Sequence, residues 1–168
     1  MEEINVALGI AGAVITLGLS AVGSGLGTGR AGASAVGAWK KCYAQGKPAP
    51  FILLSYVGAP ITQTLYGMIV MFVMINTATS AGFRPGGGIA MLIIGIFSGI
   101  AMGLSAHFQG LVAAAAADSQ AETGSGLANN MSAIGIVETV AIFVMVFTLI
   151  AVGNLAVVDP AAVTAAAG

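Results

Sequence analysis

The residue of this sequence best suited to ion chemistry is Glu138, the one charged side chain between Thr123 and Val158. It lies near the middle of a long apolar segment, where a charge costs at least about 2.5–3.5 kcal/mol on membrane-insertion scales. Burial at that depth favours the neutral acid unless a cation or hydrogen-bond donors compensate. A carboxyl in such a position can take up and release a proton or a small cation, and we predict this role for Glu138.

Polar side chains of an earlier apolar segment are expected at the same depth. Thr62, Gln63 and Tyr66 lie near the middle of that segment, and Thr139 lies beside Glu138. Carboxylate, carboxamide and hydroxyl oxygens are the ligands that suit a hard cation. We therefore predict that these five side chains bind the ion, with Na+ held at Glu138, Gln63 and Thr62, and with H+ as the alternative ion.

Pro60 is expected to add a backbone ligand to this set. A proline inside a helix removes one backbone hydrogen bond and clashes with the preceding turn. Carbonyl oxygens near Tyr56 and Ala59 are thereby freed, and in a membrane they need another partner. We predict that the carbonyl of Ala59 faces the ion.

Simpler interpretations of the same residues stay open. A protonated Glu138 can form one hydrogen bond between helices, although a glutamine such as Gln63 would do so at lower cost. Thr62 and Gln63 can each bond to carbonyl groups of their own helix. The sequence contains no nucleophile–base pair, so we predict a non-catalytic protein without an organic cofactor.

The composition places these residues in a membrane protein. Hydrophobic residues make up 58% of the chain and charged residues only 7%, against about 25% charged in a typical soluble protein. Four nearly uncharged stretches exceed the roughly 20 residues that an α-helix needs to cross a bilayer. A net charge of −1 also argues against nucleic-acid binding. We predict an all-α membrane protein with transmembrane helices over 4–43, 50–77, 87–121 and 127–155.

The basic residues predict how the chain crosses the membrane. Four of the five lie around the first connection: Arg30, Lys40, Lys41 and Lys47. The positive-inside rule places that connection in the cytoplasm, so both termini lie outside the cytoplasmic (inner) membrane. We predict two fused helical hairpins, 4–77 and 87–155, the second carrying the ion-binding Glu, and an extracytoplasmic tail, 156–168.

The two halves of the chain resemble each other weakly. Their alignment pairs Gly25 with Gly103 and Gln63 with Glu138. The second half therefore carries the carboxyl, whereas the first half has its uncharged isostere. We expect one transported ion per protomer.

Small residues recur at every fourth position in the first and third helices. They mark one face of each helix, namely Ala21, Gly25, Gly29, Ala33 and Gly37 in the first and Gly95, Gly99 and Gly103 in the third. Such faces let helix backbones approach closely. Their repetition over several turns favours a homo-oligomeric ring with helices 1 and 3 inside, and a simple four-helix bundle is the alternative.

Together these features resemble the four-helix proteolipid, the K or c subunit, of V-type rotary ATPases. The resemblance covers roughly residues 5–155 and is carried by the runs Thr62-Gln63-Thr64-Leu65-Tyr66-Gly67, Phe97-Ser98-Gly99-Ile100-Ala101 and Val137-Glu138-Thr139. It implies a rotating ring, driven by ATP hydrolysis in a separate soluble sector, that carries Na+ or H+ on Glu138. The implied partners are identical protomers, a stator membrane subunit that supplies an arginine, and central-stalk subunits on the cytoplasmic face.

The chain departs from the sodium-binding members of that family at one position. They follow the run that ends at Ala101 with a glutamine, which supplies an amide oxygen, whereas this chain has Met102. A thioether is a poor ligand for a hard cation. The sequence therefore predicts a site that lacks one oxygen ligand, to be replaced by a water or by the Ala59 carbonyl.

Two other classes of protein compete with a ring subunit. A four-helix channel or small ion-coupled carrier would act as a monomer or dimer and would need polar residues in both halves. A purely structural scaffold would leave Glu138 without a role. The single acidic site favours the ion-translocating ring subunit.

Overall fold

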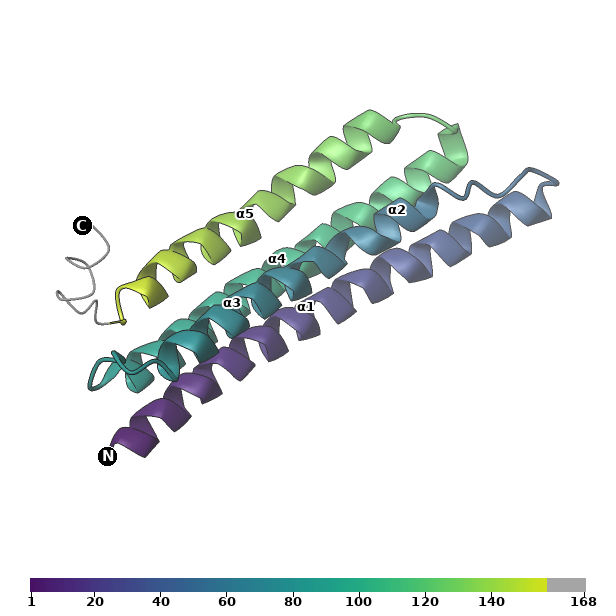
Figure 1. Ribbon diagram of the computed structural model, residues 1–168. Helices are drawn as coiled ribbons and strands as arrows, with labels where there is room; N and C mark the ends of the chain where they lie inside the picture. The colour runs from purple at the N-terminus through teal and green to yellow at the C-terminus, as the bar shows by residue number, and fades with distance from the viewer. Residues whose placement is uncertain (157–168) are drawn as a thin grey trace.

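The computed structural model describes residues 1–156. In that range the chain forms helices α1 (Glu2–Ala44), α2 (Leu53–Gly58), α3 (Thr62–Ala78), α4 (Gly87–Thr123) and α5 (Leu127–Gly153), with a 3-10 turn, η1 (Ala59–Ile61), between α2 and α3. Since α2, η1 and α3 continue one another, the described chain consists of four long rods (Figure 1). Each is long and apolar enough to cross a membrane. For the described residues, the predicted all-α fold with four helices suited to cross a membrane is confirmed.

The rods lie side by side and alternate in direction along the chain (Figure 1). One end of the molecule carries the α1–α2 and α4–α5 connections and is called the lysine end, after Lys40, Lys41 and Lys47. The other end, called the terminal end, carries Met1, the α3–α4 connection and the last residues of the described chain. The predicted tail lies outside the described residues, apart from Ala156.

A short glycine turn makes α4 and α5 an antiparallel hairpin. Gly124 ends α4 with φ +66° and donates its N–H to the Gln120 carbonyl at 2.9 Å, and Gly126 precedes α5 with φ +90°. These φ values are readily adopted by glycine alone. Because the turn is so short, residues of α4 and α5 at equal distances from it along the chain lie opposite each other.

The closest helix contact joins α1 and α4, which run in the same direction. A Cβ added to Gly95 would collide with the Gly12 carbonyl, one added to Gly23 with the backbone of Gly103, and one added to Gly110 with the backbone of Gly27. Glycine is therefore required where the two backbones touch. The predicted close approach along Gly95 and Gly103 of α4 is confirmed.

The face of α1 in this contact is not the one that carries Gly25. A Cβ added to Gly25, Gly29 or Gly37 would meet nothing within 4 Å, because these residues are exposed on the protomer. The contact uses Gly12, Gly23 and Gly27 instead. The packing of the Gly25 face inside a ring stays a prediction. Because α1 has two faces of small residues, spacing does not tell which one a helix of the same chain covers.

Candidate ion-binding site

The site begins where Pro60 interrupts the second rod. Pro60 is buried within η1, and α3 starts at Thr62. The Ala59 carbonyl accepts the backbone N–H of Thr62, and it also accepts the Thr62 hydroxyl at 3.0 Å. The predicted break in the helix is present. The Ala59 carbonyl, which was expected to face the ion, has both of its partners within the turn.

Glu138 lies on α5, half-buried, with a donor at each carboxyl oxygen. The Tyr66 hydroxyl donates to Oε1 at 2.6 Å, and the Gln109 amide nitrogen donates to Oε2 at 3.3 Å. Donors that point at a carboxylate stabilise its charged form. The structure therefore brings together groups of α3, α4 and α5 around one carboxyl.

Gln109 is the functional residue that the sequence reasoning missed. It is fully buried, and its amide nitrogen also donates to the Ile134 carbonyl at 3.3 Å. Gln109 and Glu138 lie at nearly equal distances along the chain from Gly124, so the hairpin places them opposite each other. Counting from the turn at Gly124 would have found this pair.

The expected loss of an amide ligand at Met102 is therefore corrected. Met102 is fully buried among apolar side chains that include Met91 and Ala141. Gln109 follows it by two helical turns on the same face of α4. The amide beside Glu138 is therefore that of Gln109, and position 102 lies in the apolar cluster.

A chain of hydrogen bonds connects the second rod to the carboxyl through α4. The Thr62 hydroxyl lies 3.2 Å from Gln63 Oε1, and Gln63 Nε2 donates to Gln109 Oε1 at 2.8 Å. Gln109 in turn donates to Glu138. Gln63 is fully buried and reaches the carboxyl only through Gln109. Of the predicted residues, Thr62, Gln63, Tyr66 and Glu138 thus belong to one polar cluster.

Thr139 is not part of this cluster, contrary to expectation. It is exposed, and its hydroxyl donates to the Ile136 carbonyl of its own helix at 2.7 Å. The physical reason is the helical period, which turns successive residues by about 100°. A residue that directly follows Glu138 therefore points away from the side where Tyr66 and Gln109 lie.

A second buried polar group lies closer to the lysine end. The Tyr56 hydroxyl donates to Gln120 Oε1 at 3.2 Å and accepts a hydrogen bond from Asn130 Nδ2 at 3.3 Å. Ile134, which is 2% exposed, separates Asn130 from Glu138 along one face of α5. This group joins α2, α4 and α5 at a different depth and does not contact the carboxyl.

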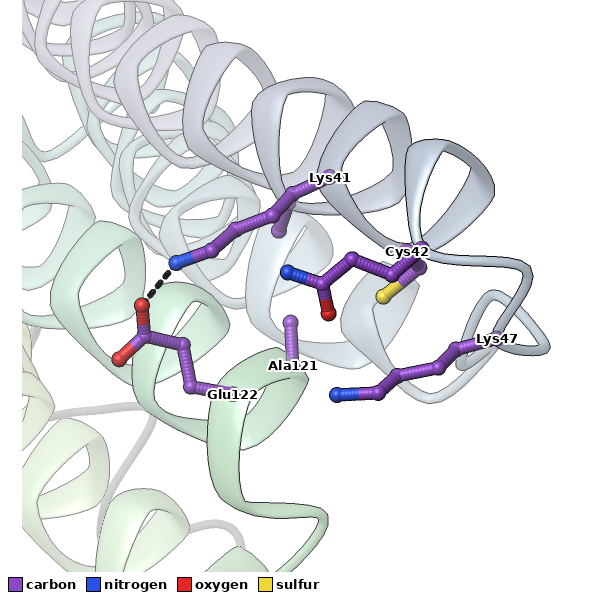
Figure 2. Close-up of a pocket in the computed structure, with 7 residues that line it drawn as sticks. Lys41, Cys42, Lys47, Ala121 and Glu122 are labelled. Atoms are coloured by element: carbon purple, nitrogen blue, oxygen red, sulfur yellow. Dashed lines mark hydrogen bonds and ion pairs between the residues drawn. The ribbon is translucent and has the colours of Figure 1, made fainter.

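The hollow at the lysine end has a different character (Figure 2). It encloses about 220 Å³ between the last turns of α1 and α4, where Lys41 pairs with Glu122 and where Cys42 and Lys47 line the other side. Lys41 and Glu122 are each about half exposed, and exposed pairs contribute little to stability. More than three helical turns separate Glu122 from Gln109 along α4. This hollow is therefore not part of the cluster around Glu138.

The cluster can hold a small cation or a proton. Its oxygens are the two of the Glu138 carboxyl, the amide oxygens of Gln63 and Gln109, and the Thr62 hydroxyl, and these are typical ligands of hard cations. In the arrangement described, the Gln109 amide turns its nitrogen toward the carboxyl. Rotation of that amide would offer its oxygen instead.

Comparison with known proteins identifies a relative of this chain. The chain is 31% identical, over 144 residues, to the A-type ATP synthase subunit K of Methanocaldococcus jannaschii. The match covers 85% of this chain and 60% of the relative, so the chain spans less than two thirds of the relative's length. No protein-family model matches the chain.

Proposed function

Since the chain belongs to the proteolipid (K or c) subunits of the V/A-type rotary ATPases, we propose that it is an ion-translocating ring subunit that carries one ion on Glu138. The observation that supports this most directly is the carboxyl in the middle of a membrane-spanning helix, held by Tyr66 and Gln109 from two other helices. The subunit itself is non-catalytic. It moves the ion while another part of the complex turns over ATP.

The transport step follows from the cost of a charge in lipid. An ionised Glu138 is stable while its two donors and a polar partner surround it, but it cannot face hydrocarbon. The ion therefore neutralises the carboxyl before the protomer leaves the stator, and an arginine of the stator displaces the ion on return. In this proposal Glu138 supplies the charge and Tyr66 orients it.

Sodium is the ion that the ligand set favours. A proton needs only the carboxyl and one acceptor, whereas Thr62, Gln63 and Gln109 add oxygens that suit a hard cation. Gln109 supplies the amide that Met102 was expected to remove. When the cation binds, Oε1 of Gln109 turns toward the ion and the Gln109 N–H groups turn away from Glu138, so the hydrogen bond from Gln63 Nε2 to Gln109 Oε1 is lost. H+ is the alternative cargo for the same carboxyl.

The sequence repeat supports a ring. It aligns Ala21 and Gly25 of α1 with Gly99 and Gly103 of α4. In the protomer, α1 covers Gly99 and Gly103, while Gly25 is exposed with open space beside it. We propose that α4 of the next protomer covers Ala21 and Gly25 in the same way. An inner wall of alternating α1 and α4 helices results, with α3 and α5 outside.

The position of the charges supports an orientation in the cytoplasmic membrane. Lys40, Lys41 and Lys47 lie at one end of the rods, and the positive-inside rule puts that end in the cytoplasm. Both ends of the chain then lie outside. Central-stalk subunits would contact the lysine end, and the stator subunit would contact α5 at the depth of Glu138.

The test is chemical labelling of Glu138 by a hydrophobic carbodiimide, which reacts with protonated carboxyls in lipid. Millimolar Na+, but not K+, should protect Glu138 at mildly alkaline pH. Labelling that follows pH alone would show a proton ring. The mass of the detergent-extracted protein separates the ring from a channel or carrier, because a monomer or dimer contradicts the ring.

A further inference from the structure

Two hydroxyl oxygens on α1 are buried without a hydrogen-bond partner, Ser24 Oγ and Thr28 Oγ1. Ser24 is only 4% exposed. The two preceding hydroxyls on the same line of α1, those of Thr16 and Ser20, donate to carbonyls of their own helix at 2.9 and 2.8 Å. A buried polar group without a partner is costly and therefore rare in folded proteins.

The packing of α1 against the second rod shows what these hydroxyls face. A Cβ added to Gly67 would lie 2.7 Å from Ser20 Oγ, and one added to Gly27 would lie 2.9 Å from Pro60 Cβ. The two rods are antiparallel, so these contacts fix their register. The stretch of α1 between Ser20 and Gly27 lies level with the stretch of the second rod between Gly67 and Pro60.

Ser24 therefore lies level with Gln63, and Thr28 lies one turn further on, level with η1. One N–H of the fully buried Gln63 amide donates to Gln109, and the amide carries a second N–H. Pro60 also deprives the Tyr56 carbonyl of its helical donor. The register of the two rods thus brings the two hydroxyls to the level of the Gln63 residue and of the turn that contains Pro60.

We propose that Ser24 and Thr28 bind an ordered water molecule between α1 and η1, and that this water positions the Gln63 amide. Buried waters make about three hydrogen bonds to groups that are otherwise unsatisfied. In membrane helices, Ser and Thr side chains and ordered waters commonly satisfy carbonyls freed by proline. This water accepts from Gln63 and donates to the Tyr56 carbonyl. Its effect on the ion rests on the proposed function, whereas the water itself rests on the packing alone.

Substitution of the hydroxyls tests for the water. A hydroxyl that binds a water and a hydroxyl that has no partner predict changes of opposite sign in the melting temperature. Thr28→Val keeps the size of the side chain and removes the hydroxyl. If the hydroxyl binds a water, the melting temperature of the detergent-purified protein falls by a few degrees. If it has no partner, the melting temperature rises or stays the same, and the proposal is overturned. Ser24→Ala is the second variant, and Ser20→Ala, which removes a hydroxyl bonded within α1, is the matched control.

Two further measurements test separately whether the water is present and whether it affects ion binding. A density map of the purified protein that resolves ordered solvent should show a peak within hydrogen-bond distance of Ser24 Oγ and Thr28 Oγ1, and a map without it overturns the water. In Thr28→Val, Na+ protection of Glu138 should weaken about fivefold, the equivalent of one net hydrogen bond. Unchanged protection overturns the effect on Gln63. Failure of Na+ to protect the unsubstituted protein counts against sodium as the transported ion and does not bear on the water.

Discussion

The two hairpins of the chain follow one plan but contribute unequally to the cluster. In the second hairpin, α5 is continuous from Leu127 to Gly153 and carries Glu138. In the first, the equivalent rod is interrupted by η1 and carries Gln63 at the aligned position. Glu138 receives one donor from each hairpin, Tyr66 from the first and Gln109 from the second. The site therefore requires both hairpins.

This difference gives a physical reason why only one of the two halves carries a carboxyl in the middle of a span. Two carboxyls at one depth would each need a cation before meeting lipid, and each would raise the cost of ionising the other. Gln63 keeps the shape of a carboxyl side chain and adds an N–H that Gln109 accepts at 2.8 Å. The first hairpin thus supplies lining groups, and the second supplies the charge.

The largest effect is expected from removing the charge of Glu138, or from moving it to position 63. Glu138→Gln should reduce ATP-driven ion uptake by vesicles that contain the assembled complex to background, because no other carboxyl of the described residues lies in the middle of a span. Adding Gln63→Glu should not restore uptake, since the Gln63 side chain hydrogen-bonds to Gln109, whereas the Tyr66 hydroxyl donates to Glu138. Uptake by the single variant would contradict the role of Glu138. Uptake by the double variant would show that the hairpins are interchangeable.

The next largest effect is expected from substitution of Gly25 and Gly103, the two glycines that the sequence repeat aligns. A Cβ at Gly103 would lie 2.6 Å from the Leu19 carbonyl, whereas one at Gly25 meets nothing within 4 Å. Gly103→Leu should destabilise the protomer by about 1–3 kcal/mol or more through overpacking. Gly25→Leu should leave the protomer folded but prevent assembly of the ring.

The mass and the melting temperature of the detergent-purified variants distinguish these outcomes. A folded but small Gly25→Leu protein is the expected result, together with a poorly folded Gly103→Leu protein. An intact ring from Gly25→Leu would remove the exposed face of α1 from the proposed interface. A well-folded Gly103→Leu protein would contradict the α1–α4 contact itself.

A smaller effect is expected at Gln109, which we compare with Met102. Gln109→Leu removes a donor to Glu138 and an amide oxygen for the ion, so the concentration of Na+ that protects Glu138 should rise about 10–100-fold. Met102→Gln should not improve protection, because it buries an amide in an apolar cluster. It should instead lower stability by about 1–3 kcal/mol. Improved protection by Met102→Gln would show that a side chain at position 102 can supply the ligand that the sequence analysis expected there.

These residues also show what the sequence could and could not predict. Helix bounds and the depth of Glu138 follow from hydrophobicity and turn signals, which are local. Gln109 was missed because its position beside Glu138 depends on the length of the turn at Gly124. The face of α1 that contacts α4 does not follow from the sequence, because both of its small-residue faces satisfy the same spacing rule, and only the other helices decide which one is covered.

The smallest effect should separate Thr62 from Thr139, the two threonines that were expected to bind the ion. The Thr62 hydroxyl lies 3.2 Å from Gln63 Oε1 and donates to the Ala59 carbonyl at 3.0 Å, so Thr62→Val removes both interactions. One net hydrogen bond corresponds to about a fivefold rise in the Na+ concentration needed for protection. Thr139→Val should change nothing, because its hydroxyl is exposed and bonded within α5. Carbodiimide labelling at a fixed alkaline pH measures both variants. Equal losses in the two would mean that α5 turns when the ion binds and brings Thr139 to the carboxyl, whereas a loss at Thr62 alone supports the arrangement described.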